Sequence, residues 1–296
     1  MNFLKFTPLY VALSTLVIGA GLLSLAVNGI HLSVDFTGGS LLELQLPSTP
    51  ADSGALISEV QSLPDIETVS LSETNLLSVK ALQLSSEEKQ QIIAQAEKAA
   101  GAVTVSRFDV IGPTISAELL KKTAAAILVV AVFITWYVGR QFDELKYGVC
   151  AVLAMVHDSL VLIGSFSIFG YLYGVEVDVL FVTAVLTTLS FSVHDTIVVY
   201  HRIRELRLKH PGESLPVLIN YAVAGTITRS INNSLTIIFM LLALVLLGGA
   251  TIKWFAVALL VGAITGTYSS AAVALPLLLA WESVEKKLRA RRLQRV

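Results

Sequence analysis

Residues 180–200 read LFVTAVLTTLSFSVHDTIVVY, and this stretch decides the class of protein. It is apolar and has the length of about 20 residues that a helix needs to cross a bilayer. It nevertheless contains Asp195, with His194 directly before it. An ionised carboxylate is costly in hydrocarbon, so such a residue usually faces a bundle interior and marks a path for ions or protons. The stretch therefore predicts a membrane protein with a functional acid inside one span.

Composition supports this class. The chain has 296 residues, of which 54% are hydrophobic and 15% charged, whereas a soluble domain is about 25% charged. The net charge of −1 argues against a nucleic-acid partner. The single cysteine, Cys150, excludes an internal disulfide and a cysteine metal cluster. The sequence shows no nucleophile elbow, phosphate loop or cofactor motif, so we expect neither an enzyme nor a bound cofactor.

Six segments have the length and apolar character of spanning helices. They are Leu9–Val27, Thr123–Gly139, Tyr147–Gly170, Val179–His201, Ile227–Leu247 and Trp254–Ala280. The first resembles a signal peptide, because Lys5 precedes it and Ser24-Leu25-Ala26 resembles a cleavage site. Its apolar stretch is long for a signal peptide, whose apolar core has about 7–15 residues. We therefore expect an uncleaved anchor.

Lysine and arginine predict the orientation, since they are enriched in cytoplasmic loops. Lys5, Arg140, Lys146, the arginines of 202–207 and the tail from Lys286 all fall on one side. The short loops on the other side carry only Lys253. Both termini should therefore be cytoplasmic. The basic tail, residues 281–296, is also suited to contact anionic lipids.

A long polar segment, residues 28–122, separates the first two spans on the outer side. Its patterns predict strands near 40–46, 68–72, 76–82 and 102–108, with helices at 51–63 and 85–100. Ser85 and Glu88 form a capping box, and Gly101 is a helix stop. The order β-α-β-β-α-β is typical of a ferredoxin-like domain.

We therefore predict an α-helical polytopic protein with six transmembrane helices and a small α+β ferredoxin-like extracytoplasmic domain. Its parts would be an N-terminus with the first span (1–27), the outer domain (28–122), five further helices (123–280) and a cytoplasmic tail (281–296). The outer domain shows no catalytic constellation, and we expect it to be a spacer or a binding module.

The depths of the polar residues predict where they meet. Because a helix rises about 1.5 Å per residue, Asp195 and Asn232 lie about 24 Å below the outer ends of their spans. Arg229 lies about 28 Å deep, and Asp158, with His157 beside it, about 18 Å deep. These depths favour one polar zone in the inner half of the membrane.

Helical periodicity adds to this prediction. Thr188, Ser192 and Asp195 are spaced so that they share one stripe of their helix. In the sixth span, Gly262 and Gly266 form a G-x-x-x-G pattern, which permits close helix approach but is weakly specific.

Structural interpretations remain open for the same residues. Asp195 could be a permanently charged partner of Arg229 that never takes up a proton. Arg229 could instead anchor the helix at lipid phosphates, and Asp158 and His157 could cap or bridge helices.

Several motifs, in order along nearly the whole chain, resemble those of the SecD/SecF family of protein-export membrane proteins, specifically its SecF branch. They are DFTGG at 35–39, IGPT at 111–114, VHD at 156–158, DTIVV at 195–199 followed by RIRE at 202–205, and RSINNS at 229–234. None is decisive alone, and the set together is specific.

The resemblance implies a partner, an energy source and a site. In this family SecF pairs with SecD, in an arrangement like that of the resistance-nodulation-division (RND) transporters of the inner membrane. The pair associates with the SecYEG channel and uses the proton-motive force to promote export of a translocating polypeptide. Asp195 and Arg229 match the family's proton-pathway residues. His194 and His201 stand where the family usually has Asn and Asp. The imidazole of His194, beside the carboxylate, could shift the proton affinity of Asp195, serve as a proton relay or be a neutral hydrogen-bonding substitute.

Together with His194, Asn232 and Asp158, the matched pair makes up the predicted proton pathway. Burial favours the neutral acid and a nearby guanidinium favours the carboxylate, so the two effects can poise Asp195 to take up and release a proton.

Two rival functions remain at this stage. One is a half-size RND-like transporter that exports a small molecule or lipid; substrate-stimulated proton flux in vesicles lacking the export channel would favour it. The other is a scaffold without energy coupling, which predicts that neutral substitutions at Asp195 and Arg229 are tolerated.

Overall fold

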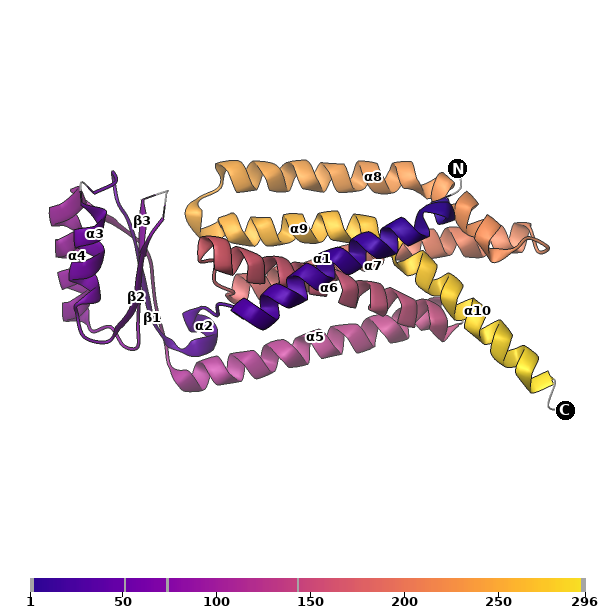
Figure 1. The fold of residues 1–296 in the computed structure, drawn as a ribbon, viewed down its shortest axis with the longest axis horizontal. Coiled ribbons are helices and arrows are strands. Elements are labelled where there is room, and N and C mark those ends of the chain that lie inside the picture. The colour runs from indigo at the N-terminus through magenta and orange to yellow at the C-terminus, as the bar shows by residue number, and fades with distance from the viewer. Residues whose placement is uncertain (1–2, 51, 73–74, 143, 294–296) are drawn as a thin grey trace.

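The computed structural model of the chain describes residues 3–50, 52–72, 75–142 and 144–293. It contains six helices that are long and apolar enough to cross a membrane. A small α+β unit lies between the first two of them, at one end of the bundle (Figure 1). Both chain termini lie at the opposite end. The predicted fold class is confirmed.

The membrane bundle is built from seven long helices, two of which share the last span. They are α1 (Thr7–Asn28, after the short η1 at Phe3–Phe6), α5 (Pro113–Gln141), α6 (Leu145–Tyr173), α7 (Val179–Lys209), α8 (Leu215–Leu247), α9 (Ala250–Ala272) and α10 (Ala274–Leu293).

Two helices begin earlier than the apolar pattern indicates. The second span was expected from Thr123 and the fifth from Ile227, whereas α5 begins at Pro113 and α8 at Leu215. Hydropathy marks only the part of a helix that lies in hydrocarbon, and both helices continue beyond it. Each has a proline in its first two positions, where the missing N–H costs no hydrogen bond.

The sixth span is bent rather than continuous. Helix α9 ends at Ala272 and α10 begins at Ala274, and Val273 between them has φ −118° and ψ −55°. Pro276 follows at once, and its ring clashes with the carbonyl four residues earlier. This is a usual cause of a helix bend.

The centre of the bundle is the contact of α7 with α9, and α7 also packs against α6 and α8. The contact is close because α9 presents glycines. A Cβ atom on Gly262 would overlap the side chain of Thr188, and one on Gly266 would lie 3.3 Å from the Cα of Ser192. The glycine pattern thus permits the close helix approach predicted for it.

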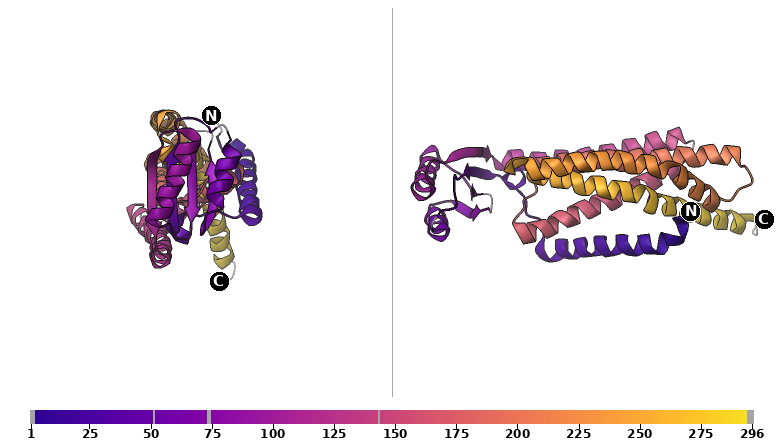
Figure 2. Two further views of the ribbon diagram at one scale, coloured as in Figure 1. Left: turned by 90° about the vertical axis from the view of Figure 1, so that its left-hand side faces the viewer. Right: turned by 90° about the horizontal axis from the view of Figure 1, so that it is seen from above.

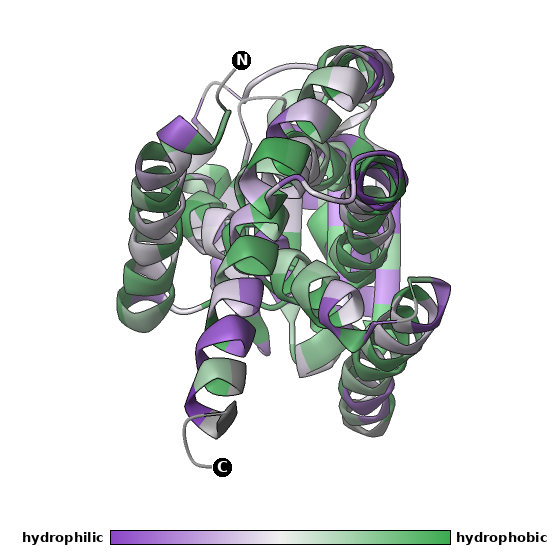
Figure 3. Ribbon diagram, turned by 90° about the vertical axis from the view of Figure 1, so that its right-hand side faces the viewer, coloured by the Kyte–Doolittle hydropathy of each residue, from purple (hydrophilic) through white to green (hydrophobic). Residues whose placement is uncertain are grey.

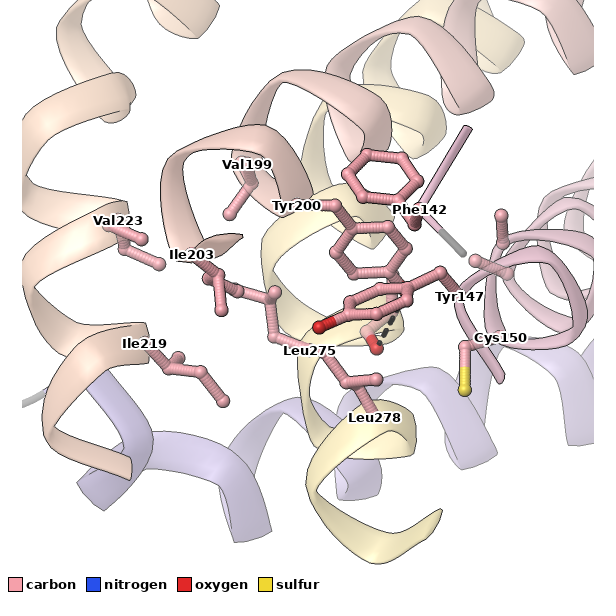
Figure 4. Close-up of a cluster of buried hydrophobic side chains, with 14 of the residues drawn as sticks. Phe142, Tyr147, Cys150, Val199, Tyr200, Ile203, Ile219, Val223, Leu275 and Leu278 are labelled. Carbon is pink, nitrogen blue, oxygen red and sulfur yellow. Dashed lines mark hydrogen bonds between the residues drawn. The ribbon is translucent and has the colours of Figure 1, made fainter. Parts of the chain in front are cut away.

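At the end that carries both termini, a buried cluster joins α6, α7, α8 and α10 (Figure 4). Tyr200 is fully buried there, and its hydroxyl donates to the carbonyl oxygen of Ala274 at 3.3 Å. The rings of Phe142 and Tyr147 pack edge-on to it. The tyrosine hydroxyl thereby finds an acceptor beside the bend, as a buried phenol requires.

An ionic network lies at the same end. Glu282 of α10 accepts from Arg207 of α7 at 2.5 Å and from Lys146 of α6 at 3.3 Å. Lys146 also pairs with Glu144. In the view from this end, hydrophilic residues lie at the ends of the helices, and hydrophilic and hydrophobic residues alternate along the helix that leads to the C-terminus (Figure 3).

The outer domain has the predicted order of elements. They are β1 (Gly39–Gln45), α3 (Ser53–Gln61), β2 (Ile66–Leu71), β3 (Leu76–Ala81), α4 (Ser86–Ala100) and β4 (Thr104–Ile111). The sheet order is β2-β3-β1-β4 with antiparallel neighbours, which is the ferredoxin-like arrangement. Helices α3 and α4 cover the face turned away from the bundle (Figures 1 and 2).

The predicted ends of α4 are confirmed. The backbone N–H of Ser85 donates to the Glu88 carboxylate at 2.8 Å, and the Glu88 N–H donates to the Ser85 hydroxyl at 3.2 Å, which completes the capping box. Gly101 ends the helix at φ 90°, a conformation that other residues adopt only with strain.

Candidate functional site

Asp195 is buried in the middle of the membrane bundle and is 7% exposed. It shares its stripe of α7 with Thr188 and Ser192, which are also buried and lie against the α9 glycines. The predicted stripe is therefore real, and the close packing against α9 shields the acid.

The threonine hydroxyl groups near the acid donate to backbone carbonyl oxygens of their own helix. Thr188 donates to the Val185 carbonyl at 2.9 Å, and Thr196 donates to the Ser192 carbonyl at 2.8 Å. The Ser192 hydroxyl oxygen is buried and has no partner within the described residues. Over the same part of the chain, the Asp195 carboxylate makes no hydrogen bond and no ion pair. A buried acid without such partners is far more easily accommodated in its neutral form.

The Asp195 carboxylate is not covered by the other predicted pathway residues Arg229, His194 and Asn232. All three side chains are exposed on the surface of this chain. His194 and Arg229 are close enough to attract the carboxylate electrostatically, but Arg229 forms no direct ion pair with it among the described residues. The single polar zone expected from depth is therefore split between a buried acid and a polar surface beside it.

The orientation of α8 explains this exposure. Its buried polar face carries Ser230 and Ser234 toward α9, where Thr267 donates to the Ser234 hydroxyl at 2.6 Å. Arg229 and Asn232 lie on a neighbouring face. Counting along a helix predicts only the position of a residue along its axis, whereas the direction of each side chain depends on tertiary packing.

Asp158 lies in a separate buried contact between α6 and α9 and is 2% exposed. One carboxylate oxygen accepts from the Ser269 hydroxyl at 2.6 Å, and the other lies 2.9 Å from Nδ1 of His157. Nε2 of His157 is buried and has no partner in the described part of the chain. The hydrogen bond from Ser269 to Asp158 bridges α9 and α6, which is one of the interpretations left open by the sequence.

A line of hydroxyl groups continues from this contact toward α1. Tyr268, next to Ser269 on α9, hydrogen-bonds with the Ser14 hydroxyl at 2.7 Å and donates to the Tyr10 carbonyl at 2.8 Å. Tyr268 also borders a cavity of about 180 Å³ between α1, α8 and α9. Thr226 adds another hydroxyl to the cavity wall.

His201, the other unusual histidine, lies near the inner end of α7. One ring nitrogen is 2.8 Å from the Gln141 side-chain nitrogen, and the ring lies 4.7 Å from that of Phe142, between centroids, at an angle of 48°. It is exposed and lies six residues beyond Asp195. Within the described ranges, no three His, Cys, Asp or Glu side chains converge in a way that could hold a metal ion.

A second polar site, not foreseen from the sequence, lies where the outer domain meets the bundle. A cavity of about 550 Å³ is lined by Asp35, Arg107, Asp109 and Asp178. Arg107 pairs with Asp109. Burial raises the pKa of Asp178, and the hydrogen bond from the Phe181 backbone partly opposes this. The only sequence signal for this site was the DFTGG motif that contains Asp35.

Comparisons with known proteins agree with this architecture. Residues 91–284 match the family described as "Protein export membrane protein SecD/SecF, C-terminal", and residues 23–46 match the "SecD/SecF GG Motif". The chain is 39% identical to the protein translocase subunit SecF of Anaerolinea thermophila, over 96% of this chain and 95% of that one. It is 37% identical to the SecF subunit of Thermobaculum terrenum, over 96% and 94% of the two chains.

A solved structure shows the same fold. The crystal structure of SecDF from Thermus thermophilus, described as a translocon-associated membrane protein, superposes with a TM-score of 0.84 at 29% sequence identity. The match covers 96% of the present chain and 39% of the SecDF chain, so this chain corresponds to part of that longer protein.

Proposed function

The chain belongs to the SecD/SecF family as a SecF subunit of the protein translocase, and from this premise we propose that it couples the proton-motive force to polypeptide export. In this proposal it works with SecD and promotes the passage of secreted polypeptides through the SecYEG channel. The family consists of transporter-type membrane proteins, and the chain is not an enzyme.

The observation that carries the proposal is the state of Asp195. Asp195 is buried on the stripe of α7 whose residues Thr188 and Ser192 lie against the α9 glycines. No described residue donates a hydrogen bond to its carboxylate or forms a direct ion pair with it. Its charged form is therefore costly, while Arg229 and His194 lie close enough to favour that form. These opposed effects give the group two protonation states that a small rearrangement can exchange.

The exposed polar groups beside Asp195 support a partner inside the membrane. His194, Arg229 and Asn232 are at bilayer depth but lie on the surface of this chain. Charged and amide groups at this depth face protein or water rather than lipid. SecD is the partner that we propose for this surface, so the proton pathway would lie between the two proteins.

The orientation follows from charge and topology. The two termini and the basic tail lie at one end of the bundle and the ferredoxin-like domain at the other (Figure 1). Because basic residues stay on the cytoplasmic side, we place both termini in the cytoplasm and the outer domain outside the inner membrane. The basic residues of α10 then lie near the anionic lipids of the inner leaflet.

The energy available is sufficient for a conformational change. One elementary charge that crosses 100 mV provides about 2.3 kcal/mol. This shifts a two-state equilibrium by about forty- to fiftyfold, because about 1.4 kcal/mol corresponds to tenfold. Protonation of Asp195 removes its attraction to Arg229, so α7 and α8 can repack and the outer domain can move with α7.

The test is export by proteoliposomes that contain this chain, SecD and the SecYEG channel, with and without a proton gradient. Asp195→Asn should abolish the gradient-dependent part of export and leave the gradient-independent part and co-purification with SecD unchanged. Asp52→Asn is a matched control, because it removes an exposed carboxylate and Asn caps a helix equally well. Gradient-dependent export by the Asp195 variant at the normal rate would disprove the coupling role.

A further inference from the structure

The segment after the first span is bound to the loop that precedes α7. The N–H of Ser33 donates to the Val177 carbonyl at 2.9 Å, and the N–H of Val177 donates to the His31 carbonyl at 2.7 Å. Leu32 and Val177 form a parallel β-bridge. These contacts join two parts of the chain that are far apart in sequence.

Asp35 extends this connection to the helix itself. It belongs to the short α2 (Val34–Thr37), is 5% exposed, and its carboxylate accepts from the Val179 N–H at 3.0 Å. Val179 is the first residue of α7, and the first N–H groups of a helix have no partner within the helix. A second of these N–H groups, that of Phe181, donates to the Asp178 carboxylate at 2.8 Å. The beginning of α7 is therefore capped once by its own residue and once by α2.

The same segment is attached to the outer domain. Gly38 and Gly39 lead from α2 directly into β1; Gly39 has φ 119°, and a Cβ there would lie only 2.7 Å from the Ala81 carbonyl oxygen of β3. Lys80 of β3 donates to the Leu32 carbonyl at 3.1 Å. The sheet and α2 therefore form one packed unit.

A second contact joins the sheet to the loop before α7. Lys80 also forms an ion pair with Glu176 at 3.5 Å; the Lys80 side chain is 15% exposed and that of Glu176 is 35% exposed. The outer domain thus holds the N-terminal end of α7 through the Asp35 carboxylate and through this ion pair.

Helix α7 makes this end mechanically relevant. It is continuous from Val179 to Asp195, a distance of about 24 Å at 1.5 Å per residue. A shift or tilt of α7 at Asp195 is therefore passed to its outer end. The hydrogen bond from Val179 to Asp35 connects the first residue of α7 itself to the unit that begins β1, whereas the contacts of Val177 and Glu176 reach only the loop before the helix.

We propose that Asp35 is a positioning residue that transmits the movement of α7 to the outer domain. The proposal rests on the function proposed above, because it requires α7 to move when Asp195 changes protonation. It assigns a task to the DFTGG motif: the aspartate holds α7, and the two glycines permit the positive φ angles by which the chain enters β1, with Gly39 close against β3.

The experiment compares two substitutions of Asp35 in the reconstituted complex with SecD and the channel. Asp35→Leu removes the acceptor, whereas Asp35→Asn retains a side-chain oxygen that can accept from Val179. A label at Leu208, an exposed residue at the inner end of α7, reports the movement of the helix, and a label at the exposed Glu97 on α4 reports the outer domain. Cys150 is buried, so labels on introduced cysteines remain selective.

We expect Asp35→Leu to keep the proton-gradient response at Leu208, to lose the response at Glu97, and to lower gradient-dependent export about tenfold, the scale of one hydrogen bond to a charged group. Asp35→Asn should retain most of both responses. Leu32→Cys with Val177→Cys, oxidised in the Asp35→Leu background, should restore export, because paired strands lie about 4.8 Å apart and a disulfide spans that separation.

Normal movement at Glu97 in Asp35→Leu would overturn the proposal, as would equal loss in the Asn and Leu variants. Loss of both label responses would also overturn it, because Asp35 would then be needed for the bundle rather than for transmission. Failure of the proposed function would appear differently: Asp195→Asn would keep its gradient-dependent export whatever residue stands at position 35.

Discussion

The contact of α7 with α9 allows the sharpest prediction about packing. A Cβ on Gly262 would overlap the Thr188 methyl group and lie only 2.6 Å from the Thr188 Cβ. Ordinary contact between carbon atoms is about 3.5–4.0 Å, so Gly262→Ala must separate the two helices by about 1–2 Å at this point. Overpacking of this kind costs about 1–3 kcal/mol.

We therefore expect Gly262→Ala to lower the unfolding temperature of the purified protein by roughly 2–12 °C. Gradient-dependent export should fall as well, because the Thr188 stripe leads to Asp195. Thr188→Gly in the same chain should relieve the overlap, so a double-mutant cycle should give a coupling of about 1–3 kcal/mol. The alanine at Gly19 is the matched control, since nothing lies within 4 Å of its Cβ.

The assay is thermal unfolding in one detergent, with export measured on the same preparations. An unfolding temperature for Gly262→Ala equal to that of the native chain would refute the packing argument. So would a cycle in which Thr188→Gly has the same effect with and without the alanine.

Three further predictions concern other polar groups. Asp158→Leu should destabilise the protein by about 1–3 kcal/mol in thermal unfolding, because the short hydrogen bond from Ser269 to a charged acceptor is lost and only the longer one to the Gly266 carbonyl remains, and a change near zero would contradict that bridge. Ser85→Ala should cost about 1 kcal/mol of α4 stability by hydrogen exchange. The hydrogen bonds from Ser85 lower the pKa of Glu88, so in the native chain this contribution is present above pH 4.5 and is lost as the pH falls through the lowered pKa. If the stability of α4 in Ser85→Ala fell with pH as in the native chain, the capping box would not be the cause of the acid sensitivity. Burial raises the pKa of Glu43, so its charge destabilises the folded state above pH 4.5; Glu43→Gln should raise the unfolding temperature at pH 8 but not at pH 4, and the opposite pH dependence would exclude this cause.

The sequence was sufficient for the parts of the fold that depend on local pattern. Apolar length placed all six spans, and the alternation near Leu42 and the capping box at Ser85 placed the elements of the outer domain in order. The ferredoxin-like topology followed from that order. These features depend on residues close in the chain, where periodicity and capping chemistry determine the structure.

The arrangement of the site depended on contacts that local pattern does not contain. Counting gave a predicted depth for Arg229, but its exposure follows from which face of α8 meets α9. The bond from Val179 to Asp35 joins residues 144 positions apart. Membership in the SecF branch favours protein export over a small-molecule transporter. It does not establish whether Asp195 takes up protons, which stays a proposal.

The most direct test of the account is the protonation state of Asp195 during the working cycle. Infrared difference spectroscopy of the complex in membranes, with and without a proton gradient, detects the C=O stretch of a protonated carboxyl group, and its absence in Asp195→Asn assigns the band. The account predicts that this band appears and disappears as the gradient is applied and removed. An Asp195 that stays ionised throughout the cycle would contradict it.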